Sequence, residues 1–269
     1  MTSTSFVVQR DGRPATVEEL KPLAFAGYAH FTAMQVRDSR VRGLDLHLER
    51  LRYASQELFG QALPDDRVRS LLRAAVEAGP ADLSLTATVY YSVGEFRAPG
   101  PDGALEVLVR TGPPASGPEG PLTLATFPYE RTLPALKHTG EVAKTYYLRQ
   151  AVARGFDDAV FVDRHGRFSE GSIWNLAFWD GTAVVWPVAG MLGGTMMGTV
   201  RRQLDRLGIP QREQAITAAD VPAFAGAVVM NSWTPGVPVH RIDSVDVPEA
   251  PAFLELLHRA HRAEPPVAP

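Results

Sequence analysis

The sequence contains no cysteine, which excludes disulfides, cysteine-based zinc sites and a cysteine nucleophile. It also lacks an apolar run of membrane-spanning length. The first residues show no basic stretch followed by an apolar one, so we expect no signal peptide. Neither sign of charge is in large excess, because the formal net charge is only -3. We therefore expect a soluble cytoplasmic protein that binds neither nucleic acid nor a membrane.

The residues that are present suit globular domains with real hydrophobic cores. Of the 269 residues, 45% are hydrophobic and 21% are charged, which is enough for one large or two modest domains. Strands and helices mix without strict βαβ alternation, which favours an α+β fold. The Pro- and Gly-rich segment 112–121 cannot form a regular element. We place a boundary there, with an N-terminal domain over residues 1–115 and a C-terminal domain over residues 116–269.

Apolar periodicity and glycine stops predict the main elements. Asp65 or Asp66 is expected to cap one helix, and Thr217 a short one. Residues 1–22 are mixed and are expected to cover an edge. Longer helices are expected over 47–58, 143–154, 196–207 and 248–262, and strands over 25–36, 83–93, 104–109, 122–127, 183–187, 227–231 and 237–242.

The stretch S-E-G-S-I-W-N-L, residues 169–176, lies between the strand-like runs 159–162 and 176–179. A lone carboxylate such as Glu170 in a turn is ordinarily solvated. Three other features accompany this one in a fixed order. Lys137 lies upstream, the turn L-G-G-T (192–195) precedes a helical pattern, and N-S-W-T-P-G follows at 231–236.

A lysine, a later carboxylate and two turns rich in Gly, Ser and Thr resemble the class IV aminotransferases. These fold-type IV pyridoxal-phosphate enzymes include branched-chain aminotransferases, D-amino-acid aminotransferases and aminodeoxychorismate lyases. The resemblance covers about residues 30–243. It implies two domains, a small N-terminal α/β sandwich and a larger C-terminal pseudo-barrel. It also implies pyridoxal 5′-phosphate as cofactor and a homodimer, since the family active site lies near a subunit boundary.

Pyridoxal phosphate needs a lysine whose amine is substantially neutral, so that it can form a Schiff base with the aldehyde. Of the lysines in the first 150 residues, Lys21 lies far before any family motif. The resemblance favours Lys137 as the catalytic lysine, because its spacing to Glu170 matches the family. Lys144 begins a predicted helix and is interpreted as a solvated residue. His138 is given at most a neutral supporting role.

The resemblance assigns the remaining cofactor contacts. Glu170 matches the glutamate that keeps the pyridine nitrogen protonated, and Asn175 is expected to fix its strand locally. The Pro and Arg of the family turn L-P-G-I-T-R are replaced here by Leu192 and Met196. The phosphate is expected to meet a helix start, a hydroxyl and a cation, supplied by Gly193, Gly194, Thr195, Ser232 and Arg50.

The substrate side is less well defined. Phe31 falls where some members have a pocket tyrosine, and Tyr91 and Arg97 come from a strand and loop that can face the substrate. Trp233 and Thr234 occupy positions where backbone N–H groups in some members meet the substrate carboxylate. No motif supports a contact between Arg97 and the substrate.

Three functions are compatible with these residues. The first is an aminotransferase that passes an amino group between an amino acid and a 2-oxo acid. The second is aminodeoxychorismate lyase, which eliminates pyruvate on the same scaffold. The third is a non-catalytic binding module with the same fold. Failure to bind the cofactor would support the third, and the response to amino acids separates the first two.

Overall fold

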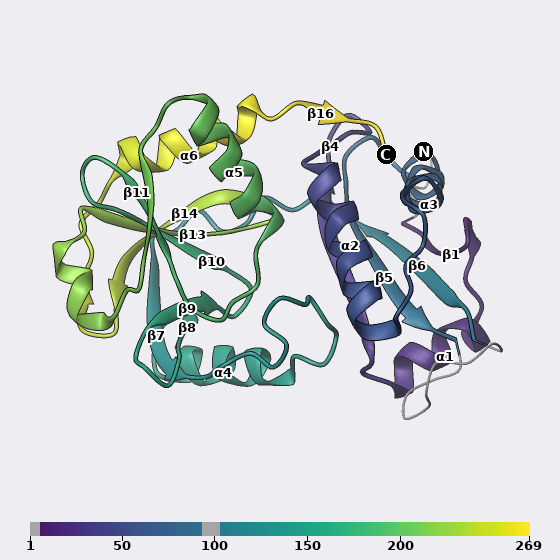
Figure 1. The fold of residues 1–269 in the computed structure, drawn as a ribbon, viewed down its shortest axis with the longest axis horizontal. Coiled ribbons are helices and arrows are strands. Elements are labelled where there is room, and N and C mark those ends of the chain that lie inside the picture. Colours follow the sequence, from purple (N-terminus) through teal and green to yellow (C-terminus); the bar gives the residue numbers. More distant parts are fainter. Residues whose placement is uncertain (1–5, 93–102) are drawn as a thin grey trace. The chain divides into compact units, whose positions relative to one another are not determined.

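A computed structural model describes residues 6–92 and 103–269, and the chain divides into two compact units (Figure 1). The sheet unit comprises Met1–Ala115, Leu136–Gly140 and Pro265–Pro269. The barrel unit comprises Ser116–Ala135 and Glu141–Glu264. The short segment that contains Lys137 therefore belongs to the sheet unit, although its neighbours in the chain belong to the barrel unit.

The sheet unit is built on a five-stranded antiparallel sheet of order β2-β1-β6-β5-β3. Burial alternates along β5, so that one face of the sheet meets the core. A separate two-stranded pairing joins β4 to β16 near the C-terminus. The strands are β1 Val8–Arg10, β2 Arg13–Pro14, β3 Ala29–Val36, β4 Val41–Arg42, β5 Leu83–Tyr91, β6 Leu105–Gly112 and β16 Pro266–Val267.

Helices α2 (Leu44–Phe59) and α3 (Asp65–Glu77) supply the apolar side chains that pack with this sheet. Helix α2 ends where predicted, because Gly60 adopts φ 69°, a left-handed conformation that suits glycine. The expected cap of α3 is wrong. Pro64 occupies the N-cap without a side-chain hydrogen bond, and Asp65 already lies in the first turn.

The sequence analysis missed helix α1 (Val17–Phe25) and began the first long strand too early, since β3 starts at Ala29. Thr16 and Glu19 form a capping box at the start of α1. The helix has no buried residue. Pro22 lies inside the helix, and a proline ordinarily ends or kinks a helix, so the pattern did not predict one here.

The barrel unit contains a nine-stranded mixed sheet. The strands β10-β13-β14-β7-β8-β9 follow one another, and β9 pairs with β10, which closes a six-stranded barrel. This arrangement confirms the α+β class. The barrel strands are β7 Leu122–Pro128, β8 Asp158–Val162, β9 Phe168–Gly171, β10 Asn175–Trp179, β13 Gly226–Asn231 and β14 Thr234–Ile242; β11 Val184–Pro187, β12 Gln211–Gln214 and β15 Val245–Asp246 extend it.

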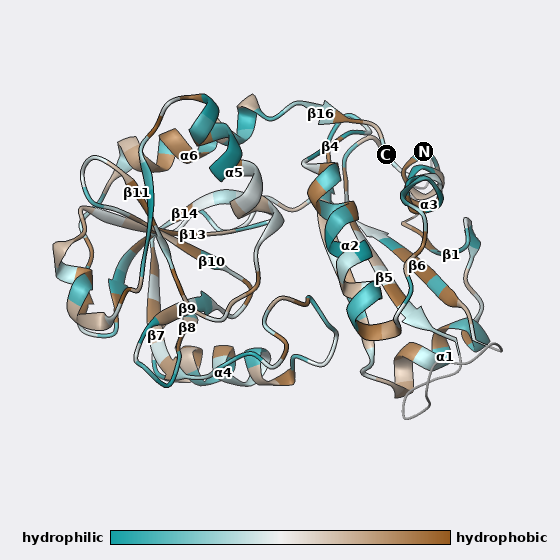
Figure 2. Ribbon diagram, in the orientation of Figure 1, coloured by the Kyte–Doolittle hydropathy of each residue, from teal (hydrophilic) through white to brown (hydrophobic). Residues whose placement is uncertain are grey.

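Both faces of the barrel strands are buried. Leu176 and Phe178 of β10 belong to one apolar cluster, whereas Ala177 packs with α5 and α6. In Figure 2 strand β10 is largely hydrophobic, while α5 carries much hydrophilic colour. The helices are α4 Val142–Ala153, α5 Thr195–Arg206 and α6 Pro251–Ala263, with the short 3₁₀ helix η1 Ala218–Ala223 capped by Thr217 as predicted.

Candidate active site

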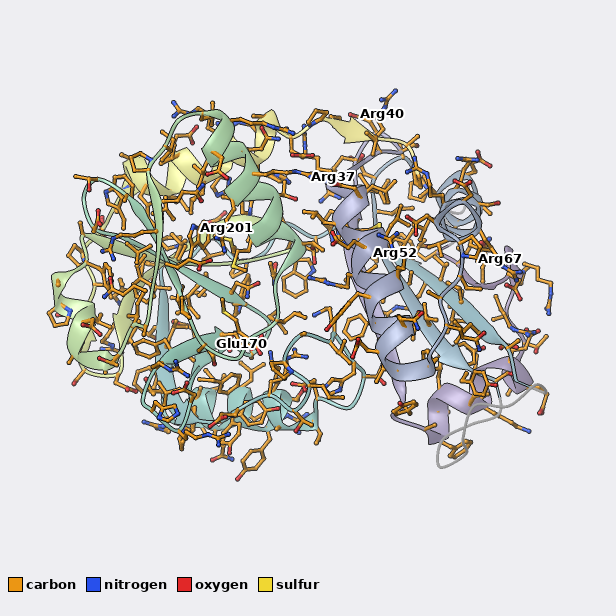
Figure 3. All side chains as sticks on the ribbon, in the orientation of Figure 1. Arg37, Arg40, Arg52, Arg67, Glu170 and Arg201 are labelled. Carbon is orange, nitrogen blue, oxygen red and sulfur yellow. The ribbon has the colours of Figure 1, made fainter. Side chains whose placement is uncertain are left out.

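Glu170 lies in β9, opposite Asn175 of β10, and is labelled in Figure 3. The residue is only 4% exposed. Its Oε1 accepts a hydrogen bond from Arg131 Nε at 2.9 Å, and its Oε2 lies 2.9 Å from Lys144 Nζ. A buried carboxylate needs charged or hydrogen-bonding partners. Glu170 has a cationic partner on each oxygen.

Lys144 reaches Glu170 from the first turn of α4. It is 7% exposed, and its Nζ also lies 3.4 Å from the carbonyl oxygen of Gly171. Burial lowers the pKa of Lys144; Glu170 opposes this effect and Arg131 adds to it. The interpretation of Lys144 as a solvated residue is therefore wrong. A helical pattern does not by itself tell which face of α4 meets β9.

Arg131 is a second residue that the sequence analysis missed. It lies in the segment after β7, is 7% exposed, and its guanidinium is shared between Glu170 and Glu141, whose Oε1 is 3.7 Å away. Tyr129 donates its hydroxyl to Glu141 at 3.3 Å. Burial, followed by the charge of Glu141, raises the pKa of Tyr129 to about 12. The donors and acceptors come from separate elements, and no local motif marks this cluster.

The loop after Glu170 is fixed by a second buried carboxylate. Asp158 of β8 accepts a hydrogen bond from Trp174 Nε1 at 2.7 Å, and burial raises its pKa. A Cβ at Gly171 would lie 3.1 Å from the Ala159 carbonyl oxygen and 3.2 Å from Trp174. The G-x-x-W spacing in this loop therefore has a steric reason as well as a hydrogen-bonding one.

Asn175 connects Glu170 with the glycine turn before α5. Its Nδ2 donates to the Leu192 carbonyl at 2.8 Å, and a Cβ at Gly194 would lie 1.9 Å from its Oδ1. Gly194 is the N-cap of α5 and provides no side-chain cap, and Thr195 begins the helix. Asn175 thus does more than fix its own strand. The N–H groups at the start of α5 are of the kind that bind phosphate.

Ser232 and Trp233 form the turn between β13 and β14. Trp174 and Trp233 meet edge to face with ring centroids 6.0 Å apart, which connects this turn with the loop after Glu170. The Trp233 N–H donates to Asn231 Oδ1 at 2.8 Å, and Thr234 is buried. The barrel unit therefore brings together the predicted residues Glu170, Gly194, Thr195, Ser232 and Trp233 through contacts of Trp174 and Asn175.

Lys137 lies in the sheet unit, beside β3. Its carbonyl oxygen accepts a hydrogen bond from Phe31 N at 2.8 Å, and its Nζ lies 4.8 Å from the centroid of the Phe31 ring. His138 forms a backbone bridge with His30. Phe31 and Lys137, two of the predicted site residues, are therefore neighbours.

His47 of α2 connects Lys137 with Arg50. His47 Nδ1 lies 2.6 Å from Thr32 Oγ1, and the ring is buried. Burial lowers the pKa of His47 to about 3, and the charges of Arg50 and Lys137 act in the same direction. The sheet unit thus brings Phe31, Arg50 and Lys137 together around a neutral histidine.

Two substrate-side predictions differ from this group. Tyr91 is 6% exposed and lies in the core of the sheet unit, where its ring stacks on Phe59 with centroids 6.2 Å apart. Arg97 lies outside the described residues. The substrate roles of Tyr91 and Arg97 remain predictions.

The family model "Amino-transferase class IV" matches residues 29–242, and the chain belongs to this family. A comparison with curated protein sequences gives no significant match. No helix in the described part of the chain is long and apolar enough to cross a membrane.

Solved structures share the fold. A branched-chain aminotransferase from Thermoproteus uzoniensis with norvaline has a TM-score of 0.83 at 22% identity, over 96% of this chain and 94% of that one. A putative 4-amino-4-deoxychorismate lyase from Legionella pneumophila has 0.78 at 18%, over 93% and 95%. A PLP-bound hypothetical aminotransferase from Mycobacterium tuberculosis has 0.77 at 20%, over 97% and 100%. These identities support the fold-type IV architecture and no particular substrate.

Proposed function

We propose that this protein is a pyridoxal-phosphate-dependent aminotransferase that moves an amino group between an amino acid and a 2-oxo acid. The observation that carries the proposal is the buried carboxylate of Glu170, joined through Asn175 to the glycine turn at the start of α5. Family membership supports the same conclusion. One buried anion and one uncapped helix start suit the two ends of this cofactor.

The residues of the barrel unit fit the cofactor at both ends. A protonated pyridine nitrogen needs a carboxylate acceptor. Arg131 and Lys144 occupy two of the roughly four lone-pair sites of the Glu170 carboxylate, so acceptor capacity is left. At the other end, the first N–H groups of α5 suit a phosphate. The contact of 1.9 Å that a Cβ at Gly194 would make explains why this turn has no side chain there.

We assign Lys137, rather than Lys144, to the cofactor aldehyde. The aldehyde and the ring nitrogen stand at opposite ends of the pyridine ring. An amine in contact with the carboxylate that holds the nitrogen cannot reach the aldehyde at the same time. Lys144 Nζ is 2.9 Å from Glu170, which disqualifies it in this conformation. The family spacing assigns this role to Lys137, which lies beside Phe31.

When bound, pyridoxal phosphate supplies an aldehyde that condenses with amines and a ring that withdraws electrons from the substrate α-carbon. With the cofactor bound, Lys137 Nζ would accept the proton of the substrate α-carbon and carry it between that carbon and the aldehyde carbon of the cofactor. The ring of Phe31 lies over one side of the Lys137 amine, with 4.8 Å between Nζ and the ring centroid. Glu170 would accept a hydrogen bond from the protonated ring nitrogen and so preserve the charge of the ring.

The proposed phosphate and substrate contacts follow the family pattern. Arg50 is the proposed cation for the phosphate, together with the turn Gly193, Gly194 and Thr195 and the hydroxyl of Ser232. Trp233 and Thr234 are proposed on the substrate side. Because the Trp233 N–H donates to Asn231 Oδ1, a contact with substrate would require that bond to be exchanged.

Borohydride trapping tests the lysine assignment. The chain contains three lysines, Lys21, Lys137 and Lys144, so peptide mass spectrometry locates the reduced cofactor adduct directly. We expect the adduct on Lys137, its loss in Lys137→Ala and its retention in Lys144→Ala. An adduct on Lys144 that survives Lys137→Ala would contradict the assignment.

The visible absorbance of the bound cofactor tests the reaction. We expect single amino acids to convert the bound cofactor to its pyridoxamine form. Comparing L- and D-amino acids identifies which configuration of the substrate the protein prefers. A bound cofactor that no amino acid converts would contradict transamination and make aminodeoxychorismate the next substrate to try. A protein that binds no added cofactor would support the non-catalytic alternative.

We also propose that the protein is a homodimer, as the family resemblance implies. Size-exclusion chromatography with light scattering measures the mass directly. A mass near the 29.2 kDa of one chain would contradict this proposal.

A further inference from the structure

The buried cluster around Glu170 holds more charge than the proposed reaction uses. A single carboxylate is enough to hold a protonated ring nitrogen. Here Glu170 is shared between Arg131 and Lys144, each with a contact of 2.9 Å. Both cations are 7% exposed. Burying a charged lysine is unfavourable unless a partner compensates it, so the presence of Lys144 calls for an explanation.

We propose that Lys144 is a positioning residue that, with Arg131, divides the negative charge of Glu170 and thereby weakens its hold on the proton of the cofactor's ring nitrogen. This inference rests on the proposed function. It goes beyond that function because the reaction itself requires only Lys137 and Glu170. The consequence is a ring that withdraws electrons less strongly than one facing an unshared carboxylate.

The charges around Lys144 support this role. The groups that face its Nζ are Glu170 from β9, Arg131 from the segment after β7, Glu141 from the start of α4 and Asp158 from β8. Arg131 is partly neutralised by Glu141 at 3.7 Å. Lys144 also faces Glu141 and Asp158, and both cations contact Glu170 at 2.9 Å, so each acts directly on the charge of Glu170. Removing the charge of Lys144 should raise the proton affinity of any base that Glu170 holds.

The position of Lys144 is also well defined. Besides Glu170, its Nζ contacts the Gly171 carbonyl oxygen at 3.4 Å and lies 5.9 Å from the Phe161 ring. The residue belongs to the first turn of α4, and the helix anchors its backbone. Lys144→Met keeps an unbranched side chain and removes the charge. Lys144→Arg keeps the charge and changes the shape, so the two variants separate electrostatics from packing.

The first experiment needs no cofactor. Because the chain has three lysines, ¹³Cε-labelled lysine gives three NMR signals, and Lys144→Met assigns one of them. We expect the Lys144 signal to titrate at a lower pH than the ordinary value for a lysine. In Glu170→Gln it should titrate lower still, because Glu170 raises the pKa of Lys144. A Lys144 signal that titrates at the ordinary lysine value and does not respond to Glu170→Gln would overturn the proposal.

The second experiment follows the ring nitrogen. Pyridoxal phosphate labelled with ¹⁵N at this position is bound to the native protein, Lys144→Met and Lys144→Arg, and the ¹⁵N shift is followed with pH. We expect the nitrogen to lose its proton at a pH higher by roughly one unit in Lys144→Met than in the native protein. Lys144→Arg should follow the native curve.

The outcomes separate this inference from the proposed function. Equal titration curves in all three proteins, with cofactor bound, would overturn the role of Lys144 and leave the function intact. A native protein that binds no cofactor would contradict both the role of Lys144 and the proposed function. Tryptophan fluorescence checks the fold of each variant, because Trp174, Trp179, Trp186 and Trp233 all belong to the barrel unit. If Lys144→Met does not fold, Lys144→Gln replaces it.

Discussion

The two units bury their polar groups in different ways. In the sheet unit, two buried histidines pair with neutral hydroxyl groups. His30 Nε2 lies 2.8 Å from Ser55 Oγ, and His47 Nδ1 lies 2.6 Å from Thr32 Oγ1. In the barrel unit, buried residues carry formal charges; they are Arg131, Lys144, Asp158, Asp163, Glu170 and Glu264.

This difference shows what each kind of burial requires. A neutral histidine needs only a hydroxyl partner, whereas a buried ion needs an opposite charge and further hydrogen bonds. The barrel unit supplies them through Arg131, Lys144 and the Trp174 Nε1–H. Buried charge that is compensated in this way is typical of sites where chemistry is carried out. Glu170, the carboxylate that the proposed function uses, is one of these buried charges of the barrel unit.

The largest effect on stability is expected from Glu170→Gln. This change removes the anion from between two buried cations, and we expect the free energy of unfolding to fall by about 3–5 kcal/mol. Urea unfolding followed by tryptophan fluorescence measures it, because all four tryptophans lie in the barrel unit. A loss no greater than that of an exposed ion pair would contradict the importance of this cluster.

The sheet unit should instead respond to acid. Burial lowers the pKa of His30 to about 4 and that of His47 to about 3, from 6.5. Between these values and 6.5 the unfolded chain binds more protons, so stability falls as the pH drops below 6.5. At pH 5 the expected loss is about 2 kcal/mol for each histidine.

Matched variants test this source of acid sensitivity. Gln in place of His30 mimics Nε2, and Asn in place of His47 mimics Nδ1, so each keeps one hydrogen-bonding position. We expect His30→Gln/His47→Asn to flatten the dependence of urea unfolding on pH between 5 and 7.5, measured by circular dichroism. An unchanged slope would assign the acid sensitivity to other groups.

A smaller effect is expected from Trp174→Phe. This change leaves buried Asp158 without the indole donor now 2.7 Å away, which should lower the free energy of unfolding by about 2 kcal/mol. Trp186→Phe is the matched control, since Trp186 Nε1 donates to the neutral Gln211 at 2.9 Å. Thermal unfolding of both variants compares them, and equal losses would show that the charge of Asp158 is irrelevant.

The smallest effect is expected from Arg164→Ala. Arg164 binds Glu130 through two hydrogen bonds of 2.8 and 2.7 Å, a geometry as good as that of Arg131 with Glu170. The arginine side chain is 73% exposed, and solvent screens such pairs. We expect urea unfolding to be unchanged within error. A clear loss in the free energy of unfolding would mean that the geometry of an ion pair, rather than its burial, determines how much it stabilises the protein.

The local pattern predicted the elements that carry their own signals. Helix α2 ends at Gly60, and the 3₁₀ helix η1 starts after Thr217, because a left-handed glycine and a capping box are short-range features. Helix α1 was missed although Thr16 and Glu19 form a capping box at its start, because Pro22 interrupts the helical pattern. The cap of α3 was wrong because Pro64 takes the position that the pattern assigned to an aspartate.

The sequence alone determined the family, the order of Lys137, Glu170, the glycine turn and Ser232, and the α+β class. Only the tertiary structure decided which charges surround Glu170. Arg131 stands 39 positions from Glu170, and Lys144 stands 27 positions from Gly171. No periodic pattern in the sequence can predict contacts over such separations. From the sequence, a lysine in the first turn of a helix is expected to be solvated, whereas the packing of the barrel unit buries Lys144. Burial depends on how the whole chain packs. That packing makes Lys144 an ion-pair partner of Glu170 rather than a surface residue.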